Sequence, residues 1–484
     1  MRVLNDILKG IEFLLVEGKL SSKVTNIAFD SRKVTKGSLF VAVRGTQTDG
    51  HSFIASAIEK GATVIVCEEI PANKPENITF IQVKNAAAAL GNLASNYYDN
   101  PTDILKLIGV TGTNGKTSIV TLLYHLFKGL GFKCGIISTI RVLIDDKEKP
   151  ATHTTPDPVQ LNSYFADMVI KGCEYCFMEV SSHAIDQHRI AGLNFCGGIF
   201  TNITRDHLDY HLTFDNYLRV KKAFFDSLTK DAFALVNSDD KHSQFMLQNC
   251  SALKKTYGIK NTADFKTKII ESDITGMQLL VNGHEFHTSR VGNFNASNIT
   301  AVYGTAILLG ADEEKVLTQL SIPVTVDGRF EILYGSKNII GIVDYAHTPD
   351  ALENVLSAIQ EVNSLNGRII TVFGCGGNRD KGKRPMMGKI AAEMSDLAII
   401  TSDNPRLEEP GQIISEIEAG VDKLFQKKVL SISDRENAIK TACKLAQPND
   451  IILIAGKGHE NYQDIDGVKN PFDDKIVLTK YLKE

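Results

Sequence analysis

Short apolar segments alternate with amphipathic segments along most of the chain. From Ile104, the apolar stretches "ILKLIGV" and "KCGIIST" flank the helical pattern "SIVTLLYHLFKGLG", and the alternation continues through "YCFMEVSS", "CGGIFTNI" and "AFALVNSDD". Such alternation predicts parallel strands joined by crossover helices. Near residues 333–340 the pattern begins again with the apolar stretches "NIIGIVDYA", "RIITVFGCGG", "LAIITSDNP", "KVLSISD" and "DIILIAGKG". We therefore expect a second, doubly wound sheet, with ligands bound beyond the carboxyl ends of its strands.

The N-terminal part of the chain is organised differently. Residues 1–100 mix short strands such as "SLFVAV" and "ATVIVCE" with the helix "NAAAALGNLASNYYD", and "DNPTD" at 99–103 is typical of a linker. We predict an α/β protein of three domains. These are residues 1–100, a central domain over 101–332 with a P-loop-type parallel or mixed sheet, and a C-terminal Rossmann-like doubly wound domain over 333–484.

Composition and charge narrow the class of protein. With 484 residues the chain is too long for one hydrophobic core, and its 43% hydrophobic and 23% charged residues are typical of a globular protein. A net charge of -4 gives no reason to expect nucleic acid or a membrane as partner. No apolar run approaches the roughly 20 residues that span a bilayer, and the N-terminus lacks a signal-peptide pattern. We expect a cytoplasmic monomer without stable membrane insertion, in which Cys173 and Cys176 are structural thiols.

The stretch "IGVTGTNGKTS", from Ile108 to Ser118, lies between an apolar strand and an amphipathic helix. Its glycines let backbone N–H groups converge on phosphate oxygens, and the helix N-terminus adds a positive dipole. Lys116 would reach the outer phosphates of a nucleotide and Thr117 would hold magnesium. The strict GxxxxGK[ST] spacing fails because Val110 stands where the first glycine belongs. We expect nucleotide binding, although this loop alone also fits a motor, a switch or a kinase, or a glycine-rich turn.

Two further strands end in polar residues that suit a metal. Glu179 follows the apolar part of "FMEVSSH", and His207 lies in "TNITRDHLDYH" with Asp206, Asp209 and His211 nearby. A carboxylate and an imidazole at neighbouring strand ends can share magnesium beside ATP. Imidazole is an unusual magnesium ligand, so hydrogen-bonded loop side chains remain the alternative.

A pair of lysines, Lys221 and Lys222, lies in "NYLRVKKAFF" on a helix with an aromatic face. The ordinary interpretation is a solvated pair. Nothing in the spacing contradicts that interpretation.

Taken together and in order, these motifs are specific. They are "FDSRKVTKGSLFVAVRGTQTDGH", "GVTGTNGKTS", "MEVSSHAIDQHRI", "TNITRDHLDYH", "VDYAHTPDALE", "GCGGNRDKGKRPMMG", "DNPR" and "AGKGHE". The chain closely resembles the Mur ligases of bacterial cell-wall synthesis over essentially its whole length. The resemblance is to members that add the third residue of the stem peptide. It implies ATP-dependent addition of meso-2,6-diaminopimelate to UDP-N-acetylmuramoyl-L-alanyl-D-glutamate through an acyl phosphate.

The resemblance also assigns binding roles to matching positions. The UDP-linked substrate would be bound by Ser31, Thr46, Gln47, His153, Thr154, Thr155, Ser181, Gln187 and Arg189. ATP would be bound by Gly112, Thr113, Asn114, Gly115, Lys116, Thr117, Ser118, Asn295, Asn298, Arg329, Asp344 and His347. Diaminopimelate would be bound by Arg379, Asp403, Asn404, Pro405, Arg406, Gly456 and Glu460.

Four positions would carry the catalysis according to the resemblance, namely Lys116, Glu179, His207 and Lys221. Mg²⁺ would be held by Thr117, Glu179, His207 and Lys221. The family lysine at Lys221 reacts with carbon dioxide to form a carbamate, which reverses the ordinary interpretation of that residue.

The resemblance also suggests how diaminopimelate is told from L-lysine. Diaminopimelate has a carboxylate at its far end that L-lysine lacks, and Arg406 can hold it with a two-pronged contact. Asp403 and Asn404 would accept from the ammonium or hold the arginine. A substrate without that carboxylate would leave the arginine unpaired.

Some positions depart from the family pattern. Val110 breaks the strict phosphate-loop spacing, but "GTNGKT" is the family's own form. His153, Leu212 and Asn378 stand where relatives have Asn, Gly and Asp. None of these changes removes a group that the chemistry needs.

Three alternatives stay open at this point. Folylpolyglutamate synthetase shares the loop and lysine but lacks the uridine-nucleotide domain. A lysine-adding ligase typically lacks the arginine of "DNPR". A phosphate-loop motor or switch would leave the C-terminal motifs unexplained.

Overall fold

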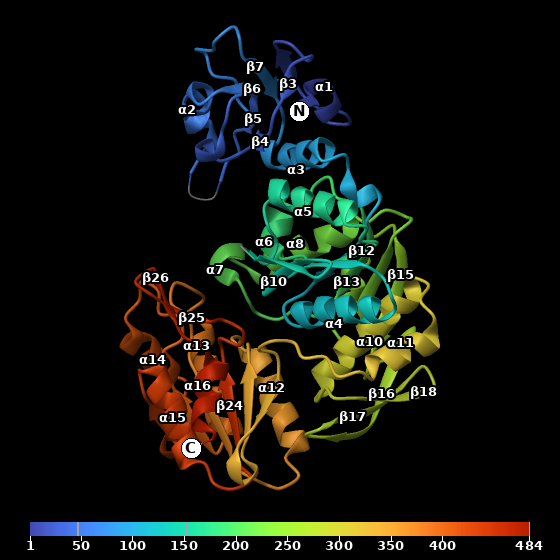
Figure 1. The fold of residues 1–484 in the computed structure, drawn as a ribbon. Coiled ribbons are helices and arrows are strands. Elements are labelled where there is room, and N and C mark those ends of the chain that lie inside the picture. The colour runs from blue at the N-terminus through green and yellow to red at the C-terminus, as the bar shows by residue number, and fades with distance from the viewer. Residues whose placement is uncertain (46–47, 152, 484) are drawn as a thin grey trace.

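A computed structural model describes residues 1–45, 48–151 and 153–483. Three α/β domains follow one another along the chain, each built around its own sheet (Figure 1). The central domain lies between the other two in Figure 1, and the C-terminal domain packs beside the end of the central domain that carries α7. The predicted α/β class and the parallel or mixed central sheet are confirmed.

The N-terminal domain has a sheet in the order β2-β7-β6-β5-β4, and β1 pairs with β3 beside it. The strands are β1 (Arg2–Val3), β2 (Leu15–Glu17), β3 (Lys23–Val24), β4 (Ile27–Ala28), β5 (Ser38–Val41), β6 (Ala62–Cys67) and β7 (Thr79–Gln82). The helices are α1 (Leu4–Ile7), α2 (Ile54–Glu59) and α3 (Ala86–Tyr97). The two strands and the helix expected from the sequence here are β5, β6 and α3. Asn85 caps α3 by accepting from the N–H of Ala88.

The central sheet runs in the order β11-β10-β9-β12-β8-β13-β14-β15-β16-β17-β18. Its strands are β8 (Lys106–Thr111), β9 (Cys134–Ile137), β10 (Arg141–Ile144), β11 (Lys147–Pro150), β12 (Tyr175–Glu179), β13 (Phe195–Phe200), β14 (Phe233–Asn237), β15 (Leu253–Gly258), β16 (Phe265–Asp273), β17 (Gly276–Val281) and β18 (His284–Thr288). The run from β9 to β16 is parallel, as the alternating pattern predicts, and antiparallel strands extend both edges.

Helices cover both faces of this sheet. They are α4 (Lys116–Gly129), α5 (Pro158–Ile170), α6 (Ser182–Asp186), α7 (Leu208–His211), α8 (Phe214–Asp226), α9 (Ser243–Met246), α10 (Asn293–Leu308) and α11 (Glu313–Leu320). Helices α4, α10 and α11 share one apolar core with the sheet, and α5 and α8 share the other. Because both faces are covered, the central strands are apolar on both sides.

The C-terminal sheet has the order β19-β20-β24-β21-β22-β23. Its strands are β19 (Glu331–Tyr334), β20 (Ile340–Asp344), β21 (Ile369–Phe373), β22 (Leu397–Ile400), β23 (Val429–Ser431) and β24 (Ile451–Ala455), and β25 (Tyr462–Ile465) pairs with β26 (Val468–Pro471). The helices are α12 (Pro349–Val362), α13 (Lys383–Met394), α14 (Pro410–Glu418), α15 (Arg435–Leu445) and α16 (Asp474–Tyr481). All five expected strands are present and parallel, while β19 adds an antiparallel edge.

This topology brings the predicted functional segments to the carboxyl ends of parallel strands, where ligands bind in such sheets. The phosphate loop follows β8, Glu179 ends β12, and Asp344 ends β20. No helix in the part of the chain that the structure describes is long and apolar enough to cross a membrane.

Candidate active site

A cavity of about 510 Å³ lies between the central and C-terminal domains. Its lining includes the predicted residues Thr113, Asn114, Gly115, Lys116, Thr117, Ser118, Thr154, Glu179, Ser181, His207, Asn298, Arg329, Asp344, His347 and Arg379. Residues that the resemblance assigns to ATP, the UDP-linked substrate and the metal therefore share one cavity. Of the residues assigned to the amino acid, Arg379 is in this lining, whereas Asp403, Asn404, Pro405, Arg406, Gly456 and Glu460 are not.

The phosphate loop has backbone geometry that requires glycine at two positions. Gly112 has φ +147 and Gly115 has φ +89, and these backbone conformations are strained for any residue that carries a Cβ atom. A Cβ on Gly112 would lie 1.8 Å from Thr201 Oγ1, and one on Gly115 would lie 2.6 Å from Asn298 Oδ1. Val110, by contrast, is a buried residue of β8, so the loop turns only after the strand ends.

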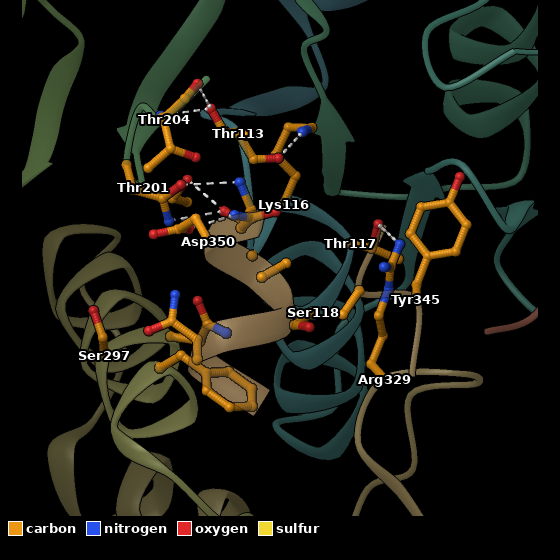
Figure 2. A pocket seen from close by; sticks show the side chains of 18 of the residues that line it. Thr113, Lys116, Thr117, Ser118, Thr201, Thr204, Ser297, Arg329, Tyr345 and Asp350 are labelled. Atoms are coloured by element: carbon orange, nitrogen blue, oxygen red, sulfur yellow. Dashed lines mark hydrogen bonds between the residues drawn. The ribbon is translucent and has the colours of Figure 1, made fainter. Parts of the chain in front are cut away.

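Hydrogen bonds with the residues that follow β13 fix the shape of this loop. The N–H of Thr113 donates to the Asn202 carbonyl (2.9 Å), and the N–H of Asn114 donates to Asn202 Oδ1 (2.9 Å). The Thr113 hydroxyl also accepts from the N–H of Thr204 (3.1 Å), as Figure 2 shows. Asn114 Nδ2 reaches the other domain and donates to Asp350 Oδ2 on α12 (2.9 Å). The loop is thus preorganised and tied to the C-terminal domain.

Two lysines converge beneath the loop on a single carbonyl. Lys116 Nζ donates to the carbonyls of Gly112 (2.9 Å) and Thr113 (2.8 Å), and Lys221 Nζ donates to Gly112 (2.8 Å). Lys221 is 1% exposed and its ammonium faces the ring of Tyr217 at 4.8 Å. Burial lowers the pKa of Lys221 well below its ordinary value, and the charge of Lys116 lowers it further. The interpretation of Lys221 as a solvated lysine is wrong.

Glu179 is the hub of the polar network at the end of β12. Its carboxylate is 1% exposed and accepts from the Thr117 hydroxyl (2.8 Å) and from the backbone and side chain of Thr139 (2.8 and 3.1 Å). Arg329 Nη2 donates to the same Thr117 hydroxyl (3.2 Å) and its guanidinium stacks on Tyr345, 4.1 Å from the ring centre (Figure 2). Thr117 is therefore linked to Glu179 and, through Arg329, to Tyr345 of the C-terminal domain.

His207 lines the cavity in a left-handed backbone conformation, with φ +53. Its Nε2 lies 3.4 Å from Asp206 Oδ2, and its ring packs edge-on against His183. Burial lowers the pKa of His207 because it disfavours the imidazolium. A neutral imidazole is the form that can accept or ligate.

The C-terminal wall of the cavity carries Asp344 and His347. Asp344 accepts from the N–H groups of Phe330 and Ala346, both at 2.7 Å, and burial raises its pKa to about 6. His347 hydrogen-bonds the Tyr345 carbonyl (2.8 Å), and burial lowers its pKa to about 4.

Helix α10 brings the two predicted asparagines to different places. Asn298 lines the cavity, whereas Asn295 donates to the Val291 carbonyl (2.8 Å) inside the protein.

The residues that are expected to hold the muramoyl-dipeptide lie close together, beside the end of β12 and helix α6. Thr155 Oγ1 donates to the Glu179 carbonyl (2.8 Å), and Thr154 accepts from Thr139 (3.0 Å). Arg189 donates to the Thr155 carbonyl (2.8 Å) and to Gln187 Oε1 (2.6 and 3.0 Å).

The other residues that are predicted to bind this substrate belong to the surroundings of that cluster or to the first domain. Ser181 caps α6, and burial lowers the pKa of His153. Ser31 begins a short 3₁₀ turn in the N-terminal domain, and its carbonyl accepts from Lys60. Thr46 and Gln47 lie outside the described residues.

The "DNPR" segment and the "GKGHE" segment face each other after β22 and β24. Asn404 Oδ1 accepts from Lys457 Nζ (3.0 Å), and Asn404 Nδ2 donates to Glu460 Oε2 (2.8 Å). Asp403 is buried, and a Cβ on Gly456 would lie 2.5 Å from its Oδ2. The two segments are interlocked by polar side chains.

Arg406 lies at the rim of this region. The N–H of Glu408 donates to the Pro405 carbonyl (3.0 Å), so the segment makes a turn, and Arg406 takes φ +52. Its Nη1 donates to the Gly377 carbonyl (2.7 Å), and its side chain is partly buried. Arg379 lines the cavity nearby and faces Asp209 of the central domain at 3.7 Å.

Several site residues were not predicted from the sequence. Lys457 is fully buried between Asn404 and Glu460, and Tyr345 stacks on Arg329. A lysine between two glycines after an apolar strand is a signal that could have pointed to Lys457. Tyr345 carried no signal of its own in the sequence.

The structure and the sequence match known proteins over the whole chain. Residues 23–98 match the Mur ligase family catalytic domain, residues 110–306 the Mur ligase middle domain, and residues 328–458 the Mur ligase glutamate ligase domain. The chain is 56% identical over 480 residues to the UDP-N-acetylmuramoyl-L-alanyl-D-glutamate–2,6-diaminopimelate ligase of Cytophaga hutchinsonii, and the match covers 99% of each chain.

Solved structures of related ligases also have this fold. A structure of a UDP-N-acetylmuramoyl-L-alanyl-D-glutamate–2,6-diaminopimelate ligase matches with a TM-score of 0.69 and 30% identity, covering 100% of this chain and 99% of that one. The MurF ligase of Thermotoga maritima in complex with ADP has a similar fold, with a TM-score of 0.63 and 20% identity over 90% of this chain and 94% of its own. The protein belongs to the Mur ligase family of ATP-dependent, amide-forming ligases.

Proposed function

We propose that the protein joins meso-2,6-diaminopimelate to UDP-N-acetylmuramoyl-L-alanyl-D-glutamate with cleavage of ATP to ADP and phosphate, in peptidoglycan precursor synthesis. The observation that carries this proposal is the shared cavity. A phosphate loop, a buried carboxylate and two polar strand ends of the C-terminal domain line it together. The relative from Cytophaga hutchinsonii bears the name of this activity at 56% identity.

ATP would bind with its phosphates over the loop from Gly112 to Lys116, against the N-terminus of α4. Lys116 is held beneath the loop, where its charge can meet the transferring phosphoryl group. Arg329, Asp344 and His347 would close the nucleotide from the C-terminal side.

The residues present fit Mg²⁺, which prefers oxygen ligands. The Thr117 hydroxyl and the Glu179 carboxylate lie 2.8 Å apart at the edge of the loop, and both line the cavity. His207 lines the same cavity with a neutral ring, and the Lys221 carbamate would supply a further oxygen ligand for a second ion. Mg²⁺ would neutralise charge on the phosphates while the first bond forms.

Lys221 has the chemical setting that carbamate formation requires. Only the neutral amine attacks carbon dioxide, and burial lowers the pKa of Lys221, which favours that form. The product would place an anion beside Lys116, which is a second cation beneath the loop. That arrangement would remove the repulsion between the two lysines.

The reaction would proceed in two steps. The side-chain carboxylate of D-glutamate attacks the γ-phosphorus of ATP, and ADP leaves, which gives an acyl phosphate. The amine of diaminopimelate then attacks the acyl carbon, loses a proton, and phosphate leaves. Lys116 would reduce the repulsion between the two anions of the first step. A closed cavity between two domains would keep water from the acyl phosphate.

Selectivity for the amino acid would come from the two facing segments. Arg406 would pair with the far carboxylate of diaminopimelate, helped by Arg379, while Asp403 and Glu460 are anions that suit its ammonium. L-lysine lacks that carboxylate and would leave Arg406 without its partner. Asn404 and Gly456 hold the segments together, and Pro405 shapes the turn that carries Arg406.

The UDP-linked substrate would lie along the first two domains. Ser31 in the N-terminal domain, with Thr46 and Gln47, would bind the uridine nucleotide. The dipeptide would extend to Arg189 and Thr155 beside Glu179, where its carboxylate meets ATP. We propose that this site acts within a cytoplasmic monomer, since each substrate has its residues in one chain.

The test is an amino-acid panel with purified protein, ATP and the UDP-dipeptide, measuring ADP release. Release should require the UDP-dipeptide and meso-diaminopimelate together. Equal turnover with L-lysine would remove the proposed specificity. Equal turnover without any amino acid would remove the ligase assignment.

A further inference from the structure

Arg435, the first residue of α15, is a buried cation directly behind the two facing segments. Its Nε and Nη2 donate to the two carboxylate oxygens of Asp474, each at 2.7 Å, and neither side chain is exposed. Asp474 is the first residue of α16. A two-pronged pair of this kind fixes the plane and position of the guanidinium.

The same guanidinium bonds two backbone carbonyls that lead into the amino-acid segments. Nη2 donates to Ala455 (3.0 Å) and Nη1 donates to Ser402 (3.4 Å). The residues that follow these carbonyls are Gly456 and Asp403.

Strands β22 and β24 are not neighbours in the sheet, because β21 lies between them. No ladder hydrogen bond therefore joins β22 directly to β24 in the described chain, and Arg435 bonds the carbonyl that follows or ends each of them.

The charge of Arg435 also acts on Asp403. Burial alone would raise the pKa of Asp403, but the charges of Lys457 and Arg435 outweigh it and hold the pKa below its ordinary value. Asp403 therefore stays an anion that suits the ammonium of an amino-acid substrate.

We infer that Arg435 is a positioning residue for the amino-acid substrate, because it holds the turn at 403–406 at a fixed distance from the turn at 456–460. This inference rests on the proposed function. Asp474 serves as the fixed counter-ion that aims the guanidinium at both carbonyls.

The opposite end of the same sheet provides a matched control. Arg368 precedes β21 and Asp450 precedes β24, and Arg368 Nη2 donates to Asp450 Oδ2 at 2.7 Å. This pair also joins two strands of the C-terminal sheet through an arginine and an aspartate. It lies at the amino ends of the strands, away from the cavity.

The experiment compares Arg435→Lys with Arg368→Lys in the full-length protein. Lysine keeps the charge but makes a point contact instead of a fork. Arg435→Lys should raise the KM for meso-diaminopimelate about tenfold and leave the KM values for ATP and the UDP-dipeptide unchanged. Arg368→Lys should leave all three KM values unchanged. Thermal unfolding of both variants measures their loss of stability separately.

Asp474→Asn provides a second variant, which keeps one acceptor for the guanidinium and should raise the same KM in the same direction. Equal effects of Arg435→Lys and Arg368→Lys on the KM for diaminopimelate would overturn the inference, as would an unchanged KM in folded Arg435→Lys and Asp474→Asn. If the wild-type protein releases no ADP in response to diaminopimelate, the proposed function fails instead.

Discussion

At the scale of single residues, a buried lysine and a partly buried lysine determine the electrostatics beneath the phosphate loop. Lys116 and Lys221 donate to the same Gly112 carbonyl, and Lys221 is 1% exposed. Such a pair is unfavourable while both carry a proton, because the interior screens charges poorly. An anion formed on Lys221 would relieve that repulsion.

Replacement of Lys221 by alanine is the first prediction. Lys221→Ala should lower kcat about a hundredfold, because the variant cannot form the proposed carbamate, which would balance the charge of Lys116 and supply a metal ligand. Short-chain acids such as formate should restore part of the activity, whereas bicarbonate should not. Lys222→Ala is the matched control, since Lys222 pairs with Asp226 on the same helix. Wild-type activity in Lys221→Ala would contradict the role.

Replacement of Arg406 by lysine tests which residue determines the selectivity for the amino acid. Arg406→Lys should raise the KM for meso-diaminopimelate about tenfold while the KM for ATP stays unchanged, because lysine cannot form the two-pronged contact. Steady-state kinetics with diaminopimelate and L-lysine measure the ratio of kcat/KM values. An unchanged ratio would show that selectivity comes from another part of the pocket.

At the scale of elements, the site depends on how strands end. The strands β8, β12, β20, β22 and β24 each deliver a polar segment at their carboxyl ends. Apolar runs followed by glycine or polar residues made these positions predictable from the sequence. The hairpins β17–β18 and β25–β26 were not predicted, although Asn282-Gly283 and Asp466-Gly467 take positive φ values at their turns and are strong hairpin signals.

The loop after β8 gives the prediction at this scale. Gly112→Ala should abolish ATP binding, because the added Cβ would lie 1.8 Å from Thr201 Oγ1 and φ is +147. Isothermal titration with a non-hydrolysable ATP analogue measures the affinity. Gly411→Ala on α14 is the control, since its Cβ meets nothing within 4 Å. Normal affinity in Gly112→Ala would mean that the loop does not hold the phosphates in this shape.

At the scale of the whole molecule, the cavity depends on how the second and third domains meet. Asn114 donates to Asp350 and Arg205 pairs with Asp380, each across the domain boundary. These contacts join residues more than 170 positions apart, as with Arg205 and Asp380 at a separation of 175. Local sequence patterns predict the elements but not these pairings, because the packing of whole domains decides them.

The pair formed by Arg205 and Asp380 tests whether domain closure matters for activity. Arg205→Asp should lower kcat/KM about fivefold, since two carboxylates would then face each other at the boundary. The double variant Arg205→Asp with Asp380→Arg should recover most of that loss. A double variant no better than Arg205→Asp would indicate that the pair does not hold the closed form.

An isotope-labelled reaction tests whether an acyl phosphate links ATP cleavage to amide formation. Purified protein is mixed with ATP, meso-diaminopimelate and a UDP-dipeptide whose D-glutamate side-chain carboxylate carries oxygen-18, and the products are analysed by mass spectrometry. The proposed reaction should give equal amounts of ADP and UDP-tripeptide, with one labelled oxygen in the released phosphate. ADP formed without UDP-tripeptide, or phosphate without the label, would contradict it.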